Sequence, residues 1–311
     1  MARLVGLRLL AGLATLLAAS ILIFAVIQLL PGDAATAVLQ QQASNKKALA
    51  ALRHSYGLDR PAPIRYLKWI EGAVRGDFGR APASGVPVTT LIGTPLRNTG
   101  ILLAVTLVLM LPLAIVIGAA SALRRQGWLD GVVQTIVLVL ASLPSFAVGI
   151  VLILTFAFLW KVFPAVSLTI TPRSLVLPVA TLVLGWVPLT ARMVRAGVVG
   201  VLDSDYVQMA RLKGMPEPSV VRRHVLPNAL VPAVQAFALT AASMPAGIVI
   251  VEYLFAFQGI GYTLVQAVEN RDTATVEAIT LILVVVYIVA NLLSDVATVM
   301  LTPRLRTQTL G

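Results

Sequence analysis

The sequence has no cysteine and only two histidines among its 311 residues. Without cysteine, the chain cannot form disulfides, thiol nucleophiles or thiolate metal sites. The histidines, His54 and His224, fall on opposite faces of the topology predicted below, so they cannot share a metal ion. Gly-x-Ser-x-Gly, His-Glu-x-x-His and Gly-Lys sequences are also missing, which excludes those hydrolase motifs and a P-loop for ATP phosphates. We expect a chain that is not an enzyme, holds no metal or cofactor, and depends on another subunit for any ATP that powers it.

Charged residues are scarce as well. They make up 12% of the sequence, against about 25% in soluble domains, while hydrophobic residues make up 58%. Neutral stretches lie between the charges, each near or above the roughly 17–25 residues that cross a bilayer as a helix. They are Leu9–Gly32, Asn98–Leu123, Gly131–Trp160, Ser174–Ala191, Val225–Val251 and Ala278–Ser294, the last extending past Asp295 to Leu301. We therefore predict an all-α, polytopic membrane protein with six transmembrane helices.

The positive charges are distributed unevenly along the chain. The net charge is +11, and the positive-inside rule places short loops rich in Lys and Arg in the cytoplasm. The N-terminus, the 124–130 loop, the 192–224 loop and the C-terminal tail then share the cytoplasmic face. The segment 33–97 is also basic, but it exceeds about 60 residues, a length at which the rule weakens. The first apolar run is too long for a signal-peptide core of about 7–15 residues, so we predict a retained first span and two cytoplasmic termini.

The long polar segment 33–97 has helical patterning of its own. We expect one short helix over Lys46–Tyr56, ended by Gly57, and a second over Pro63–Val74, followed by a turn at 75–79. The second helix is amphipathic and contains aromatic residues. It could lie on the membrane surface near lipid headgroups or form a docking platform for an external partner, and both alternatives stay open.

Several apolar stretches contain proline. Pro144 lies inside the third predicted span, and Pro112, Pro178, Pro188, Pro232 and Pro245 lie inside others. Proline breaks helices in soluble proteins, but kinked helices are tolerated in membranes, where they often line a cavity. These prolines favour a transporter over a simple membrane anchor.

Polar residues within the predicted spans are few. Asp295 forms a polar stripe on the sixth span with Asn291 and Thr298, and a charge at that depth is costly unless it faces the bundle interior. Asp295 could be a proton or substrate site, or it could form a structural pair with an arginine near the cytoplasmic boundary, where Arg304 lies. We favour the structural pair.

The interruption at Arg192–Asn228 is polar but structured. We expect two short helices around a break, the first capped by a side chain at 203–205 and ended by Gly214 in a left-handed conformation. Pro216 or Pro218 suits the first turn of the second helix. Such a basic, partly apolar hairpin either binds another protein or only fixes the topology.

The spacing within this interruption resembles a known signature. Ala210, Gly214 and the pair Leu226-Pro227 match the EAA loop of permease subunits in binding-protein-dependent ABC importers. A fuller string resembles the dipeptide, oligopeptide and nickel branch of that family: Tyr206, Val207, Ala210, Arg211, Lys213 and Gly214, then His224, Leu226, Pro227 and Asn228. Further strings that fit are Leu29-Leu30-Pro31-Gly32-Asp33, Gly57-Leu58-Asp59-x-Pro61, Gly76-Asp77-Phe78-Gly79, Ser142-Leu143-Pro144-Ser145-Phe146, Asn291-Leu292-Leu293-Ser294-Asp295 and Pro303-Arg304-x-Arg306.

The resemblance implies a B-type permease subunit with the type I importer fold and an extracytoplasmic insertion after the first span. Residues 1–93 would be the first helix and the insertion, 94–303 the permease core with its coupling loop at 203–228, and 304–311 a cytoplasmic tail. The implied partners are a sister permease, two ATP-binding subunits that hold Mg-ATP, and a solute-binding protein, at a bacterial cytoplasmic membrane and without nucleic acid. The implied cargo is a di- or oligopeptide, with nickel, glutathione or another small solute such as an opine as alternatives. A secondary transporter is disfavoured because Asp295 is the lone intramembrane carboxylate of the predicted spans.

The match has two departures. Gln208 replaces the glutamate that names the loop, and Thr302 precedes Pro303 where aspartate is usual, so a role for a carboxylate at 208 is not expected. The small and apolar face formed by Tyr206, Met209 and Ala210 is predicted to enter a groove on an ATPase subunit, and the basic residues to meet acidic groups around it.

Overall fold

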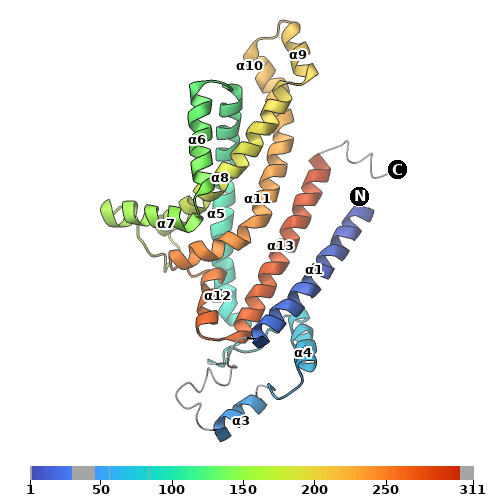
Figure 1. The fold of residues 1–311 in the computed structure, drawn as a ribbon, viewed down its shortest axis with the longest axis vertical. Helices are drawn as coiled ribbons and strands as arrows, with labels where there is room; N and C mark the ends of the chain where they lie inside the picture. The colour runs from blue at the N-terminus through green and yellow to red at the C-terminus, as the bar shows by residue number, and fades with distance from the viewer. Residues whose placement is uncertain (1, 30–45, 56, 83, 302–311) are drawn as a thin grey trace.

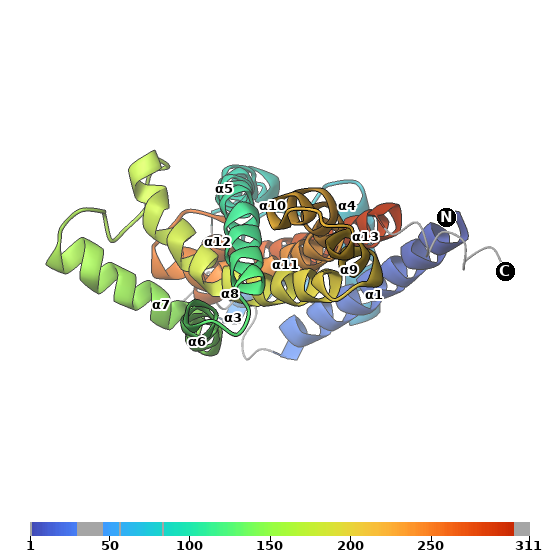
Figure 2. The same ribbon diagram turned by 90° about the horizontal axis from the view of Figure 1, so that it is seen from above.

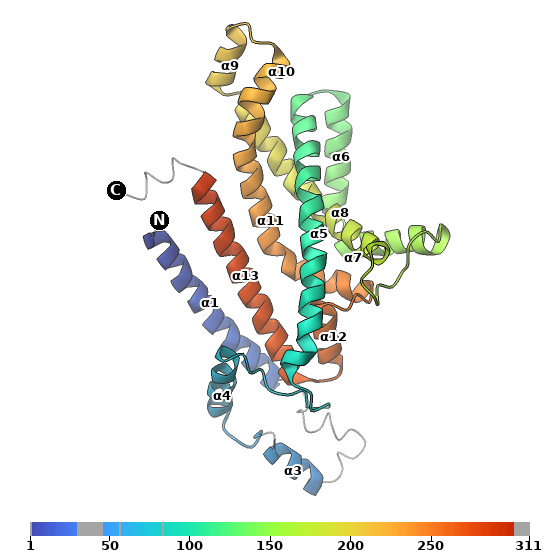
Figure 3. The same ribbon diagram turned by 180° about the vertical axis from the view of Figure 1, so that it is seen from behind.

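A computed structural model of the chain describes residues 2–29, 46–55, 57–82 and 84–301. Over these residues the chain is helical, and its only strand-like feature is an isolated bridge between Arg80 and Pro87. The helices form an elongated bundle, with α3 and α4 at one end and α9 and α10 at the other (Figures 1 and 3). Three predicted features lie outside the described residues: the end of the first span at 30–33, the departure at Thr302, and the Pro303-Arg304-x-Arg306 string.

Five long helices form the bundle. They are α1 (Ala2–Leu29), α5 (Val88–Leu123), α8 (Pro172–Leu202), α11 (Leu226–Leu254) and α13 (Thr273–Leu301). Within the described part of the chain, α1, α5, α8 and α13 are long and apolar enough to cross a membrane. These elements confirm the all-helical membrane fold, and the count of six spans stays a prediction. Pro95, Pro112, Pro178 and Pro188 lie inside α5 and α8 without ending them.

The third predicted span is not one continuous helix. It consists of α6 (Trp128–Ser142) and α7 (Ser145–Leu152), which continues into a π-helical turn over Ile153–Leu159, and the two parts are bent by 103°. The break lies at Leu143, which is extended with φ −87° and ψ 134°, because the ring of a following proline disfavours the helical conformation. Figure 2 shows α7 projecting sideways from the bundle.

The core lies where α5, α8 and α11 meet. Near the α9 end it contains Ala119, Ala122, Val194 and Val198, and towards the other end Leu102, Leu182 and Phe255. Gly118 lets α5 and α8 approach closely, since a Cβ there would lie 2.5 Å from the carbonyl oxygen of Ala191. α1 stands apart from this core and packs on α13 (Figure 3).

The end of the bundle opposite α9 carries three short helices. α3 (Lys46–Ser55) and α4 (Ala62–Val74) confirm the two predicted helices, and Gly57 has the left-handed φ of +64° expected at a helix end. α4 packs against α1, where the Tyr66 hydroxyl lies 2.8 Å from Ser20 Oγ. The third, α12 (Ile260–Glu269), was not predicted.

Candidate functional site: the hairpin between α8 and α11

The predicted hairpin is present but shorter than expected. α8 continues through Arg192 and ends at Leu202, so the polar connection consists of α9 (Asp205–Leu212), the turn at Gly214 and α10 (Glu217–Val220). Gly214 has φ +74°, as predicted for a left-handed helix end. α10 is not a separate helix, because a π-helical turn over Val221–Val225 joins it directly to α11.

The predicted side-chain cap of α9 at 203–205 is wrong, because no side chain of the described residues accepts a hydrogen bond from the first turn of this helix. Ser204 occupies the N-cap position, but its side chain accepts no hydrogen bond from the helix. Its hydroxyl donates instead to the carbonyl oxygen of Val201, at 2.5 Å. The hydroxyl thus bonds back to the last turn of α8, which helps to fix the corner between α8 and α9.

Burial divides α9 into two faces. Val207 and Ala210 are buried among Leu202, Val220 and Val225, so they hold the hairpin on the end of its own bundle. The prediction that Ala210 enters a partner's groove is therefore wrong for this chain, because its side chain is covered already. The exposed apolar residues are Tyr206, Met209 and Leu212, with 46%, 54% and 81% of their surface exposed. We call these three residues the outer stripe.

The other predicted site residues stabilise the hairpin or flank it. The Arg211 guanidinium bonds both oxygens of Glu217 across the Gly214 turn, at 2.7 and 3.2 Å. This pair holds the pKa of the Glu217 carboxyl below its usual range and raises the pKa of Arg211. Lys213 is exposed at the end of α9.

The motif residues after the turn lie at the start of α11. The Asn228 amide donates to the carbonyl oxygen of His224, at 2.7 Å. Leu226 packs against the core while Pro227 is exposed in the first turn. Because the His224 carbonyl lies in the π-helical turn, this contact supports the junction between the hairpin and α11.

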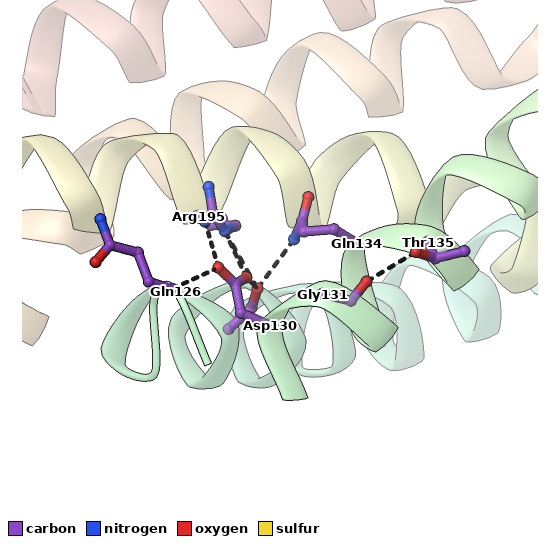
Figure 4. Close-up of polar contacts among 7 residues, drawn as sticks. Gln126, Asp130, Gly131, Gln134, Thr135 and Arg195 are labelled. Carbon is purple, nitrogen blue, oxygen red and sulfur yellow. Dashed lines mark hydrogen bonds and ion pairs between the residues drawn. The ribbon is translucent and has the colours of Figure 1, made fainter. Parts of the chain in front are cut away.

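A polar cluster behind the hairpin was missed by the sequence analysis. Arg195, on α8, forms a two-pronged ion pair with Asp130, on α6, at 2.6 and 3.0 Å (Figure 4). Ser121, on α5, also donates to Asp130, and Gln134 donates to Ser121 at 2.9 Å. The sequence did contain a signal for this cluster. Asp130 is a single carboxylate at the start of an apolar stretch, and a carboxylate that becomes buried there needs a charged partner. This cluster joins three helices below the hairpin.

A second ion pair continues from this cluster to the hairpin itself. Arg125, in the turn between α5 and α6, lies 2.7 Å from Asp203, the residue that follows the last turn of α8. The start of α6 is therefore joined to α8 at Arg195, and the turn before it is joined to Asp203 at the end of α8. These two ion pairs hold the α5–α6 turn against the end of α8 from which the hairpin begins.

The polar residues predicted within the last span lie away from the hairpin. Asp295 pairs with Arg8 of α1 at 3.1 Å, and the Asn291 amide donates to the carbonyl oxygen of Tyr287 at 2.9 Å. The favoured structural pair is thus present, but with an arginine of the first helix. No group of three or more metal-binding side chains occurs among the described residues. α3, which contains His54, lies at the end of the bundle opposite α10, next to which the π-helical turn with His224 begins (Figure 1).

Comparison with known proteins covers nearly the whole sequence. The family model "binding-protein-dependent transport system inner membrane component" matches residues 114–307, and the model of its N-terminal part matches residues 1–115. A putative peptide permease protein of Brucella suis is 34% identical over 311 residues, covering 96% of this chain and 97% of its own. A glutathione transport system permease protein of Pectobacterium atrosepticum is 33% identical over 299 residues, with the same coverage of 96% and 97%. The crystal structure of an amino acid ABC transporter with histidines shares the fold, with a TM-score of 0.52 and 19% identity over 68% of this chain and 94% of that one.

Proposed function

The chain belongs to the family of inner membrane components of binding-protein-dependent transport systems, and from this premise we propose how it works in an importer. It is a multi-pass permease subunit of an ABC importer, a transport component rather than a catalyst. Within the complex, it forms the translocation pathway together with a sister permease. Two ATP-binding subunits hold and hydrolyse Mg-ATP, and a solute-binding protein delivers the cargo from outside, so this chain carries no cofactor of its own.

In this proposal the hairpin end of the bundle faces the cytoplasm. The distribution of Lys and Arg supports this orientation, because the turn between α5 and α6, which contains Arg124 and Arg125, lies at the same end of the bundle as the basic hairpin (Figure 1). Both termini are then cytoplasmic, and α3 and α4 lie outside the membrane. The chain divides into residues 1–93, with the first helix and the external segment, the permease core 94–303 with its coupling loop at 203–228, and the tail 304–311.

We propose that the cargo is a di- or oligopeptide. The similarity to a putative peptide permease supports this choice, and the relative named for glutathione, itself a small peptide, is compatible with it. Nickel or another small solute is the alternative. Uptake of labelled di- and tripeptides by the reconstituted complex, with nickel as the competing cargo, tests the choice directly.

One observation carries the coupling proposal: the hairpin buries one face on its own bundle and leaves the outer stripe uncovered. Apolar side chains at i, i+3 and i+6 on an anchored helix are suited to a groove on a partner protein. We propose that the stripe binds an ATP-binding subunit, with Lys213 and the other basic side chains facing acidic groups around the groove. In this proposal the buried motif residues Val207 and Ala210 hold the hairpin on its own bundle, whereas the exposed Tyr206 contacts the partner.

The test introduces charge into the outer stripe. Met209→Asp and Leu212→Asp each place a carboxylate in the contact, at a cost of several kcal/mol, and each 1.4 kcal/mol weakens binding about tenfold. We expect the ATP-binding subunits to be lost on co-purification, with this chain still inserted in the membrane. Pro218→Asp is the control, because it adds the same charge at an exposed position of α10, outside the outer stripe and in the first turn of a helix, where a carboxylate is tolerated. Normal stoichiometry and normal stimulation of ATP hydrolysis in both stripe variants would show that the hairpin is only a topological connection.

A further inference from the structure

An open groove runs between α1 and α13, two helices that lie side by side at the edge of the bundle (Figure 3). It has a volume of about 510 Å³, which is within the range of small-molecule sites. Its lining extends from Arg8 to Leu16 on α1 and from Val285 to Asp295 on α13. No residue of the hairpin lines it, so the groove is separate from the coupling site.

The groove is about as deep as one leaflet of a bilayer. Arg8 lies near the start of the apolar span Gly6–Leu29, and Asp295 lies near the end of the span Thr273–Val296. The two charges therefore mark the same membrane boundary. At 1.5 Å per residue, the lining extends from there by about 12 Å along α1 and about 15 Å along α13. Half of the hydrocarbon core is about 15 Å, so the groove matches the acyl chain of a lipid in a single leaflet.

The walls of the groove offer an apolar surface. The polar side chains below the two charges bond to their own helices. The Thr15 hydroxyl donates to the carbonyl oxygen of Ala11 at 2.9 Å, and the Asn291 amide donates to that of Tyr287 at 2.9 Å. An acyl chain requires no hydrogen bonds from such walls, whereas a polar solute would leave its own groups unpaired there.

The mouth of the groove presents one charge of each sign. Arg8 Nη1 lies 3.1 Å from Asp295 Oδ2, and 57% of the Arg8 side chain is exposed. Neither side chain has another polar partner among the described residues, so the other N–H groups of Arg8 and the second oxygen of Asp295 are available. Arginine donates to phosphate and a carboxylate accepts from an ammonium group. A headgroup that carries both a phosphate and an ammonium group fits this mouth and adds no net charge to it.

We propose that the groove binds one phosphatidylethanolamine molecule, with an acyl chain between α1 and α13, its phosphate on Arg8 and its ammonium on Asp295. A glycerol headgroup brings a negative phosphate beside Asp295 without a compensating ammonium, and a choline headgroup has no N–H to donate. The lipid holds α1 on the bundle and is not cargo. This inference rests on the proposed function only for the choice of leaflet, which is the cytoplasmic one in the orientation given above.

The test is native mass spectrometry of the full chain, purified in detergent and titrated with palmitoyl-oleoyl phospholipids that carry ethanolamine, choline or glycerol headgroups. Wild type should retain one ethanolamine lipid, with an affinity several-fold above that for the other two. Arg8→Gln should weaken binding of all three by about tenfold or more, since hydrogen bonds to charged groups are the stronger ones. Asp295→Asn should weaken binding of the ethanolamine lipid and strengthen that of the glycerol lipid. If the ion pair only joined the helices, Asp295→Asn would change the three affinities equally.

Ala11→Phe and Ala14→Phe form a matched pair. Ala11 lines the groove, whereas Ala14 is exposed on α1 outside the lining, so only Ala11→Phe should lower the affinity by several-fold or more. Equal affinity of wild type for the three headgroups, or equal affinity of the two alanine variants, would overturn the inference. So would release of the lipid when the sister permease joins, because that subunit would then fill the groove. Peptide uptake by a complex without selective lipid binding would leave the proposed function standing. Selective binding by a chain that recruits no ATP-binding subunit would leave this inference standing alone.

Discussion

Arg8 and Asp295 join the first and last long helices of the chain through an ion pair of 3.1 Å. The pair lies at the edge of an open groove of about 510 Å³ between α1 and α13, lined on the α1 side by small residues such as Ala11 and Gly12. Gly12 is required for this approach, because a Cβ there would lie 2.8 Å from the side chain of Ile288. Asp295 is only 28% exposed, so its charge depends on α1 staying in place.

Removing this charge should loosen α1 without stopping transport. We expect Asp295→Asn to lower the stability of the complex by about 1 kcal/mol, the upper range for partly exposed pairs, and to leave uptake per folded complex largely intact. The measurement is a thermal unfolding series together with uptake normalised to folded protein. The double exchange Arg8→Asp with Asp295→Arg should restore the stability. Loss of uptake with unchanged stability would show instead that Asp295 acts on cargo or protons.

The sequence predicted those parts of the fold that depend on the length of an apolar run or on the pattern of neighbouring residues. Most of the apolar runs, the two short helices α3 and α4 and the left-handed Gly214 depend on neighbouring residues, and the structure shows them. The α6–α7 bend was missed because a proline inside an apolar stretch predicts a kink but not its angle, which here is 103°. The partners of Asp130 and Asp295 were missed because Arg195 and Arg8 lie far from them in the sequence. The predicted direction of Ala210 was wrong because the bundle surface that covers it exists only in three dimensions.

The Asp130 cluster should be more important to stability than its exposed neighbours. Asp130→Ala removes the carboxylate that pairs with the partly buried Arg195 guanidinium. Removing one partner of a buried ion pair lowers the free energy of unfolding by about 3–5 kcal/mol. Because the Arg195 side chain is 28% exposed, we expect a smaller loss of about 2 kcal/mol. Asp205→Ala, at an exposed position on the hairpin, should change the stability of the full chain by less than about 0.5 kcal/mol. Equal unfolding temperatures for the two variants would show that the cluster does not anchor α6.

The ion pair across the hairpin predicts a pH dependence. Arg211 lowers the pKa of the Glu217 carboxyl in the folded hairpin, so the pair stabilises the hairpin above the unfolded pKa of about 4.3. This contribution is lost as the pH falls through the lower, folded pKa. It should stay under about 1 kcal/mol, because Glu217 is 56% exposed and solvent screens the pair.

Hydrogen exchange of the hairpin amides over residues 205–220, followed from pH 7 to below pH 4, measures this effect. Exchange protection in wild type should exceed that in Glu217→Gln at neutral pH, and the difference should vanish in acid. If the difference in exchange protection between wild type and Glu217→Gln stayed constant over the whole pH range, the hydrogen bonds between Arg211 and residue 217, and not the charge of Glu217, would stabilise the turn.

The position of α12 depends on the carboxylate of Glu252, which is completely buried. Glu252, near the end of α11, accepts hydrogen bonds from the backbone N–H groups of Gly261 and Tyr262 at 2.7 and 3.2 Å and from the Thr99 hydroxyl at 2.5 Å. The same hydroxyl accepts the N–H of Ile260 at 2.8 Å. The N–H groups in the first turn of a helix have no partner within the helix. In α12 they bond instead to Thr99 on α5 and Glu252 on α11, and the negative charge of a carboxylate is favourable at a helix N-terminus.

Gly259 makes this arrangement possible, and replacing it should disrupt it. A Cβ at Gly259 would overlap the Glu252 carboxylate, which cannot move because its surroundings are packed. We expect Gly259→Ala to cost about 1–3 kcal/mol through overpacking, and Glu252→Gln a similar amount, since an amide cannot accept all three hydrogen bonds. Gly200→Ala is the matched control, because a Cβ there meets nothing within 4 Å and alanine in an exposed helix stabilises by roughly 0.5–1 kcal/mol. Thermal unfolding of the full chain in detergent compares the three variants, and a Gly259→Ala protein as stable as Gly200→Ala would show that α12 is not held by Glu252.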